Sequence, residues 1–297
     1  MKILLIRLRL IGDVVFTTPA IAAIRRRFPD AHLTYLVEPP ASPLLRGHPS
    51  LDELLVVERP RGVARILYDL ALARRLRASR FDLVIDFHGG PRSAWLAWAT
   101  GAPERIGYNV PGRAWMYTTR VAWSPSLVPP RHSVENQWDL LAPLGVEPPD
   151  RVRDPIVIPL DPQAVREVDM RLAKAGVPPH GQIIVMHVSA GNPFRRWPAD
   201  RFAAVAAALA GQDEARRIII TSGPSERDAA NRVAAAAQEA AGPAAARILR
   251  CGEFDLPQLR ALIERAALYI GGDSGPLHVA AASRTPVVAL FGPTLPE

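Results

Sequence analysis

The sequence predicts an α/β fold made of two doubly wound, Rossmann-like halves. Short apolar runs rich in β-branched residues alternate with longer helical patterns along the 297 residues, as in βαβ units with parallel sheets. Runs such as ILLI, LVID, IIVM and VVAL are almost wholly apolar, which is typical of strands covered on both faces. A proline-rich stretch, residues 143–162, separates the two series. We therefore expect domains at residues 1–155 and 156–297.

Each half is expected to contain five strands, because five apolar runs of strand length occur in each. In the first half they are Lys2–Ile6, His32–Val37, Glu53–Val57, Leu83–Phe87 and Glu104–Gly107. In the second half they are Ile183–His187, Arg217–Thr221, Arg247–Leu249, Ala267–Ile270 and Pro286–Leu290. The helical patterns between them include Ala20–Arg27, Ile66–Ala78, Pro198–Leu209, Glu226–Glu239 and Pro257–Arg265. Ligands of such folds bind at the carboxyl ends of the strands, so the strand-to-helix loops are the places to search.

The composition is that of an ordinary globular protein, with 48% hydrophobic and 22% charged residues. Cys251 is the only cysteine, so no disulfide forms within the chain and a reducing cytoplasm is expected. No apolar run reaches the ~18–20 residues of a spanning helix. The start, MKILLIRLRLIGD, is too short in its apolar part and too charged for a signal peptide.

The positive charge is concentrated in the first half. Residues 1–155 carry 21 basic and 15 acidic side chains, whereas residues 156–297 carry 15 and 14. This excess is either ordinary solvated surface charge, or it forms a surface that binds something anionic: a phosphate, a carboxylate or a membrane surface. No nucleic-acid partner is expected, because no basic cluster is interleaved with aromatic residues.

The loop after the first strand contains Gly12, which permits a tight turn, and Asp13. Asp13 either caps the next helix through its side chain or acts as a carboxylate that accepts a proton from a nucleophile. Residues 189–198, SAGNPFRRWP, supply small residues and two arginines, which suits a phosphate as well as an exposed loop.

The loop that begins GGDSGPLH, residues 271–278, opens a helix and is the most specific of the three. Its glycines allow a ligand to approach the backbone, and Asp273 or Ser274 could cap the helix. The N–H groups and dipole of a helix start favour phosphate. His278 stands one turn inside, either facing that ligand or serving as a structural histidine. No P-loop, G-x-G-x-x-G after the first strand, G-x-S-x-G, H-E-x-x-H, D-x-D or metal-ligand spacing occurs, so neither a metal nor another cofactor is expected.

The string IGGDSGPLHVAAASRTPVVALFGPT resembles the signature of the ADP-heptose:lipopolysaccharide heptosyltransferase family (glycosyltransferase family 9). The start, KILLIRLRLIGDVVFTTPAIAAIRRRFP, resembles that family's amino-terminal motif, and SAGNPFRRWP, TSGPSERDAA and RCGEFDLPQLRALIERA match segments between the two. The resemblance implies a GT-B fold of two Rossmann-like domains facing a central cleft. The first domain would bind the acceptor and the second the nucleotide-sugar donor. It also implies an inverting, metal-independent transfer of heptose from ADP-heptose to the lipopolysaccharide inner core.

The resemblance also implies roles for single residues. Asp13 matches the family's general base, and Arg195 stands where members often have a lysine at the donor diphosphate. Glu226 matches a position near the donor ribose, and Phe254 one near the adenine. The remaining donor positions are Asp273, Ser274, Gly275 and His278, which match the phosphate motif D-[ST]-G-x-x-H, and Ser189, which stands near hydroxyl residues at the diphosphate.

A lipopolysaccharide acceptor is anionic and lies at the inner face of the cytoplasmic membrane, so peripheral membrane contact is expected. Arg59, Arg61 and Arg65 are candidates to bind it, whereas Arg74, Arg75 and Arg77 read as a solvated helix face. Family members continue well past FGPT, so the donor domain is expected to be truncated at its C-terminus. The alternatives are a relative that transfers another sugar to another glycan, and a nucleotide-binding protein without catalysis.

Overall fold

In the computed structural model the chain folds into two compact units, Met1–Pro159 and Leu160–Pro296. The structure describes residues 1–123, 131–189 and 195–292, so the expected early end of the chain at Leu295-Pro296-Glu297 lies outside the described residues. Each unit contains one parallel sheet with helices, which confirms the predicted α/β class. In the part of the chain that is described, no helix combines the length and apolar character needed to cross a membrane.

The sheet of the first unit has the strand order β3-β2-β1-β4-β5-β6. The strands are β1 Lys2–Ile6, β2 His32–Val37, β3 Glu53–Val56, β4 Leu83–Asp86, β5 Glu104–Tyr108 and β6 Thr119–Val121. All neighbouring pairs are parallel. The chain runs outward from β1 to β3 and then returns to place β4 on the other side of β1. The loops after β1 and β4 therefore lie where the strand order reverses, the usual ligand position of this topology.

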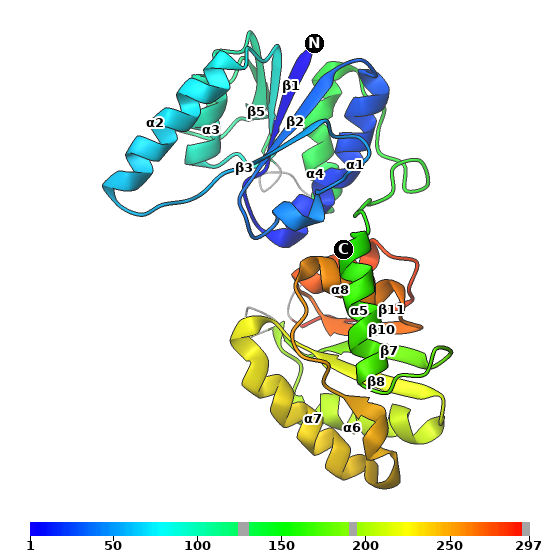
Figure 1. Cartoon of the computed structure of the whole chain (residues 1–297). Helices are drawn as coiled ribbons and strands as arrows, with labels where there is room; N and C mark the ends of the chain where they lie inside the picture. Colours follow the sequence, from blue (N-terminus) through cyan, green and yellow to red (C-terminus); the bar gives the residue numbers. More distant parts are fainter. Residues whose placement is uncertain (124–130, 190–194, 293–297) are drawn as a thin grey trace. The chain divides into compact units, whose positions relative to one another are not determined.

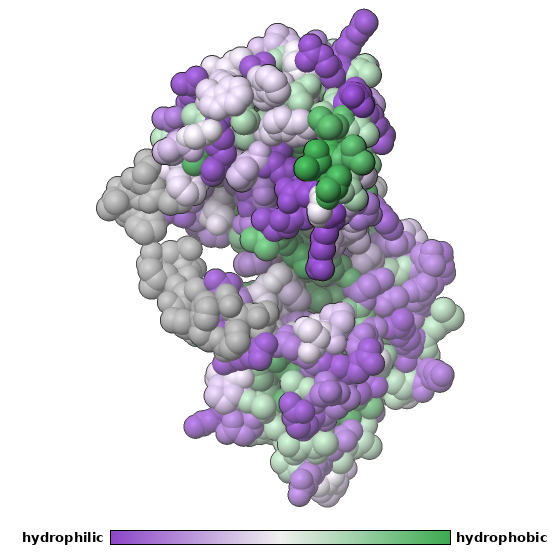
Figure 2. All heavy atoms as spheres, turned by 90° about the vertical axis from the view of Figure 1, so that its left-hand side faces the viewer, coloured by the Kyte–Doolittle hydropathy of each residue, from purple (hydrophilic) through white to green (hydrophobic). Residues whose placement is uncertain are grey.

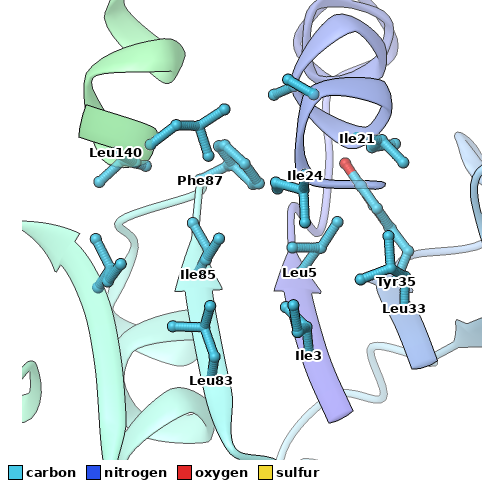
Figure 3. Close-up of a cluster of buried hydrophobic side chains, with 14 of the residues drawn as sticks. Ile3, Leu5, Ile21, Ile24, Leu33, Tyr35, Leu83, Ile85, Phe87 and Leu140 are labelled. Carbon is cyan, nitrogen blue, oxygen red and sulfur yellow. The ribbon is translucent and has the colours of Figure 1, made fainter. Parts of the chain in front are cut away.

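Helices cover both faces of this sheet (Figure 1). They are α1 Ile11–Arg27, α2 Val63–Ala78, α3 Pro91–Ala99 and α4 Ser133–Trp138, with 3-10 turns at η1 Ser42–Leu44, η2 Ala114–Met116 and η4 Asp139–Leu144. Side chains alternate along each strand, so Ile3 and Leu5 of β1 face α1 and η4, whereas Leu4 and Ile6 face α2 and α3. Figure 3 shows the first of these cores, in which strand side chains point toward α1.

The first helix begins at Ile11, before both Asp13 and the helical pattern recognised at Ala20–Arg27. Pro19 lies inside it and cannot donate a backbone hydrogen bond to the carbonyl of Val15, four residues earlier. The hydroxyl of Thr18 donates to that carbonyl instead, at 2.8 Å, and also accepts a hydrogen bond from the backbone N–H of Val157 at 3.1 Å. The helix therefore continues through a residue that normally ends one.

The sheet of the second unit has the order β11-β10-β7-β8-β9, again all parallel. Its strands are β7 Gln182–His187, β8 Arg216–Thr221, β9 Ile248–Leu249, β10 Leu268–Gly272 and β11 Val287–Leu290. The helices are α5 Pro162–Lys174, α6 Ala199–Gln212, α7 Arg227–Ala241, α8 Leu256–Glu264 and α9 Gly275–Ala281, with η6 Pro224–Glu226 and η7 Gly242–Arg247. In Figure 1, α6 and α7 lie on one face of the sheet and α5 and α8 on the other. The strand order reverses between β7 and β10.

Candidate functional site

Asp13 lies in the first turn of α1, directly after β1, and its carboxylate forms an ion pair with the guanidinium of Arg7. Arg7 also donates from Nη1 to the carbonyl oxygen of Phe87 at 2.6 Å, so it links the loop after β1 to the end of β4. Both side chains are mostly buried, with exposed fractions of 24% for Asp13 and 13% for Arg7. The structure thus brings the predicted carboxylate to the switch point of the first sheet.

Two local expectations for this loop are wrong. The N-cap position of α1 is Leu10, not Asp13, and Asp13 is instead held by an arginine. Gly12 lies within the helix, and the turn is made by Leu10, whose φ is +63°. A leucine in this region of backbone space is strained. Its side chain is 68% exposed, so burial does not offset that strain.

The loop after β4 carries His88, which the sequence reasoning did not select. Asp86, fully buried at the end of β4, accepts hydrogen bonds from the backbone N–H groups of His88 and Gly89 and from the hydroxyl of Tyr117. Burial raises the pKa of Asp86, and these hydrogen bonds act in the opposite direction. The pKa of His88 is lowered to about 4 by burial and by neighbouring guanidinium groups. At neutral pH, His88 is therefore an uncharged imidazole among arginines.

The guanidinium groups that act on His88 belong to Arg7, Arg9, Arg59 and Arg113. Arg113 donates from Nε to the carbonyl oxygen of Gly89 at 2.6 Å, so it is fixed beside the same loop. Positive charge is therefore concentrated at the carboxyl edge of this sheet, close to the carboxylates of Asp13 and Asp86. Such an edge can bind an anionic group.

Several buried polar atoms near Asp13 lack a hydrogen-bond partner among the described residues. Gln137, 4% exposed, donates from Nε2 to the backbone oxygen of Asp13 at 3.3 Å, while its Oε1 is unpaired. Asn136 Oδ1, His88 Nδ1 and Arg7 Nε are also buried and unpaired. An unsatisfied buried polar group costs about 1–3 kcal/mol, so several in one place indicate a site that a ligand or water completes.

The three predicted acceptor arginines occupy different environments. Arg59 and Arg61 are exposed in the loop between β3 and α2. Arg65 lies on α2 and pairs with Asp69, with 3.6 Å between Nε and Oδ2. Arg92 binds the other carboxylate oxygen of the same Asp69 at 2.7 Å. Arg65 is therefore part of a structural network, and Arg59 and Arg61 are the more available pair.

In the second unit, Asp273 joins the loops after β7 and β10. Its Oδ2 lies 3.1 Å from Nη1 of Arg195, and its Oδ1 lies 4.0 Å from Nε2 of His278. Ser274 is the N-cap residue of α9, but its hydroxyl makes no capping hydrogen bond and donates instead to the carbonyl of Gly272 at 3.2 Å. Gly275 is the first residue of α9. The structure therefore places Arg195, Asp273 and His278 together at the start of this helix.

Ser189 is held by a buried chain of hydrogen bonds that the sequence did not reveal. Its hydroxyl lies 2.9 Å from Nε2 of His187 and accepts the N–H of Gly223 at 3.0 Å, while Nδ1 of His187 lies 3.0 Å from the hydroxyl of Thr221. Burial lowers the pKa of His187 to about 4. This neutral histidine fixes the start of the loop after β7. The middle of that loop, residues 190–194, lies outside the described residues.

The last two donor candidates follow the neighbouring strands. Glu226, at the end of η6 after β8, pairs with Nη2 of Arg196 at 2.7 Å. Phe254, after β9, packs against the guanidinium of Arg171 on α5, 5.4 Å from ring centroid to Cζ. The predicted donor residues thus lie along one edge of the sheet, in the loops after β10, β7, β8 and β9 in that spatial order. Among the described residues, no group of three or more His, Cys, Asp and Glu side chains is arranged to hold a metal ion.

His88, Arg7 and Gln137 belong to the site but were not predicted from the sequence, and they differ in how much sequence signal they carried. His88 follows directly after a predicted strand, so a complete search of the strand-to-helix loops would have included it. Arg7 lies at the end of the first strand motif and carried a similar signal. Gln137 carried none, because it is on a short helix far along the chain and reaches the site only through the packing of α4 on α1.

The sequence is similar to those of known glycosyltransferases. A family model described as glycosyltransferase family 9 (heptosyltransferase) matches residues 70–297. A protein of Escherichia coli named lipopolysaccharide heptosyltransferase 3 is 31% identical over 297 aligned residues, which cover 97% of this chain and 82% of that protein.

Solved structures show the same fold. The structure of a family 9 glycosyltransferase from Veillonella parvula superposes with a TM-score of 0.86 at 26% identity, covering 99% of this chain and 82% of that one. The structure of E. coli ADP-heptose lipopolysaccharide heptosyltransferase II gives a TM-score of 0.79 at 22% identity, covering 100% and 86%. At that identity the second likeness shows the fold alone.

Proposed function

Because the chain belongs to glycosyltransferase family 9, and is thus a glycosyltransferase of the GT-B fold, we propose that it transfers heptose from ADP-heptose to the lipopolysaccharide inner core. The observation that carries the proposal is the set of paired charged side chains at the carboxyl edge of the second sheet, Arg195 with Asp273 and Arg196 with Glu226. Similarity to a lipopolysaccharide heptosyltransferase over nearly the whole chain supports it.

The second unit is the proposed donor half. A nucleoside diphosphate sugar offers a dianionic diphosphate, which needs cations and N–H donors. Arg195, His278 and the first N–H groups of α9 would supply them, with Ser274 and Gly275 closest to the phosphates. Asp273 contacts Arg195 and lies near His278, so it would orient both of these side chains. The proposal contains no metal and no other cofactor.

The nucleoside would extend along the same edge toward β8 and β9. Glu226 has a carboxylate that can accept hydrogen bonds from ribose hydroxyls, and its pairing with Arg196 fixes its position. Phe254, held against Arg171, would lie at the adenine. Ser189, fixed by His187, would contact the diphosphate from the loop after β7.

The first unit is the proposed acceptor half, with Asp13 as the general base. In an inverting transfer the acceptor hydroxyl attacks the anomeric carbon as the bond to ADP breaks on the opposite face, and its proton passes to a carboxylate oxygen of Asp13. Negative charge develops on the departing diphosphate, where Arg195 and His278 would stabilise it. Arg7 holds the base in position.

The anionic groups of the acceptor would meet the basic edge of the first sheet. Arg59 and Arg61 are exposed beside it, and Arg113 is fixed against the loop of His88. The proposed acceptor lies on the inner face of the cytoplasmic membrane, so the proposal places the protein in the cytoplasm.

The test is mass-resolved transfer from a panel of ADP-, UDP- and GDP-sugars to a truncated core lipid, with and without a chelator. We expect product from ADP-heptose in both conditions. Asp13→Asn should lower turnover by about 10²–10⁴-fold and leave ADP affinity unchanged, because the amide cannot accept the proton. The exposed Asp30→Asn is the matched control. Activity only with a UDP- or GDP-sugar would overturn the donor, and full turnover by Asp13→Asn would overturn the base.

A further inference from the structure

Helix α2 presents an apolar stripe to solvent. Val63, Ile66, Leu67 and Leu70 are spaced as one face of a helix, and they are 73%, 62%, 65% and 41% exposed. Single exposed apolar residues are ordinary on protein surfaces, but four large ones on one face form a patch that marks an interaction site. We call these four residues the α2 stripe.

The stripe is not the face that holds α2 to the domain. The helix packs on the sheet through Leu72, Ala73 and Leu76, which are 6%, 9% and 0% exposed. At 100° per residue, the centre of the α2 stripe lies well over a quarter turn from the centre of these buried residues. The hydrophobic core of the first unit therefore does not use the α2 stripe.

Positive charge surrounds the stripe along the chain. Between residues 58 and 80 there are seven arginines and two acidic residues: Arg59, Arg61, Arg65, Arg74, Arg75, Arg77 and Arg80 against Glu58 and Asp69. Asp69 is bound by Arg92 and Arg65, so its charge is already compensated. All the arginines except Arg65 are exposed. Figure 2, which views the side on which α2 lies in Figure 1, shows a hydrophobic patch bordered by hydrophilic side chains on the first unit.

We propose that α2 docks on the surface of an anionic lipid bilayer. An apolar stripe with arginines at both ends is the pattern of helices that lie in the membrane interface, with apolar side chains among the upper acyl chains and cations at the headgroups. The charge decides between a membrane and a protein partner, because the excess of arginine complements an anionic headgroup layer. Arg74 and Arg77 continue the face of the α2 stripe toward the end of the helix.

This surface and the proposed acceptor loop are continuous, since Arg61 stands two residues before Val63. Docking would bring Arg59 and Arg61 to the headgroup layer. The proposal does not depend on the identity of the sugar donor, because it concerns only lipid binding.

The test is flotation of the full chain with vesicles of phosphatidylcholine alone or mixed with phosphatidylglycerol. We expect binding to the anionic vesicles that weakens with salt, and much weaker binding to the neutral ones. Ile66→Ser with Leu67→Ser should lower the partition coefficient at least about tenfold, because both side chains lose favourable transfer. Arg74→Gln with Arg77→Gln should lower it about 25-fold, at about fivefold for each arginine near the surface.

Matched controls use equally exposed side chains away from α2. Val152→Ser with Met170→Ser removes two apolar groups that are 90% and 65% exposed, and Arg201→Gln with Arg232→Gln removes two exposed cations. Circular dichroism and thermal midpoints verify that every variant folds. Transfer to a water-soluble acceptor without lipid should be equal in the α2 variants and wild type, which separates this proposal from the proposed function.

The proposal would be overturned if the wild type floated equally with neutral and anionic vesicles or with neither. It would also be overturned if the α2 variants and their controls floated alike. A third contrary result is a wild-type dimer in light scattering that Ile66→Ser with Leu67→Ser converts to a monomer, since the α2 stripe would then be covered by a second copy.

Discussion

Arg92 pairs with two carboxylates of the first unit, so its removal tests how charge is balanced there. Its side chain is 7% exposed and bonds to Glu38 at 3.0 Å, to Asp69 at 2.7 Å and to the carbonyl of Glu58 at 2.7 Å. These contacts join the ends of β2 and β3 to α2 and α3. Arg92→Met keeps most of the apolar stem but removes the cation that Glu38 and Asp69 share.

The expected loss can be worked from this geometry. Breaking a fully buried pair costs about 3–5 kcal/mol, because a charge is left without compensation. Glu38 and Asp69 retain 10% and 13% exposure, and Asp69 keeps Arg65 at 3.6 Å, so we expect the lower end, about 3 kcal/mol. Arg131→Met is the control in the same unit: its pair with Asp139 is 35% and 30% exposed, and such a pair contributes about 0–1 kcal/mol.

Urea unfolding followed by tryptophan fluorescence measures this loss. All the tryptophans except Trp197 belong to the first unit, so the signal reports mainly on the unit that contains Arg92. With a slope of about 2 kcal/mol per molar urea, the midpoint should fall by about 1.5 M in Arg92→Met and by less than about 0.5 M in Arg131→Met. Adding Glu38→Gln to Arg92→Met should recover part of the loss. Equal midpoint shifts for the two single variants would refute the reasoning.

Three further outcomes follow from buried contacts. His187 is protonated below pH ~6.5 in the unfolded chain but only near pH 4 in the folded protein. Urea titrations should therefore show a free energy of unfolding that is highest above pH ~6.5 and falls by on the order of 3 kcal/mol toward pH ~4. The same dependence on pH in His187→Gln would contradict this. Thr18→Val removes two backbone hydrogen bonds and should cost about 1–3 kcal/mol by calorimetry, whereas Thr18→Ser should cost less. Gly107→Ala should lower the thermal midpoint, because its Cβ would overlap the ring of buried Tyr117, at about 1–3 kcal/mol; wild-type melting would rule out that overlap.

The strands were predictable because burial on both faces leaves a strong local signal. All ten predicted strands are present, with bounds that differ by a residue or two. Elements whose stability comes from tertiary contacts were missed. β6 has only three residues, TRV, and α3 and α4 are short helices. The helical pattern was recognised only from Ala20, although α1 runs through Pro19, where the hydroxyl of Thr18 takes the place of the missing N–H.

The positions of the candidate site followed from topology, whereas its pairings did not. Asp13 and Asp273 follow β1 and β10, so a sequence that identifies the strands also identifies their loops. The partners Arg7 and Arg195 depend on which side chains face each other across neighbouring loops. Gln137 and Asp13 are 124 residues apart in the sequence, so the hydrogen bond between them forms only once the domain has packed.

The strained turn at Leu10 has a consequence for how this protein can be varied. A residue at φ +63° with its side chain in solvent contributes little to folding, and about 1–3 kcal/mol is stored in its backbone. Leu10→Gly should therefore be among the few stabilising substitutions in a complete mutational scan. If transfer falls while stability rises, the scan will have located a residue kept by selection for activity at the expense of stability.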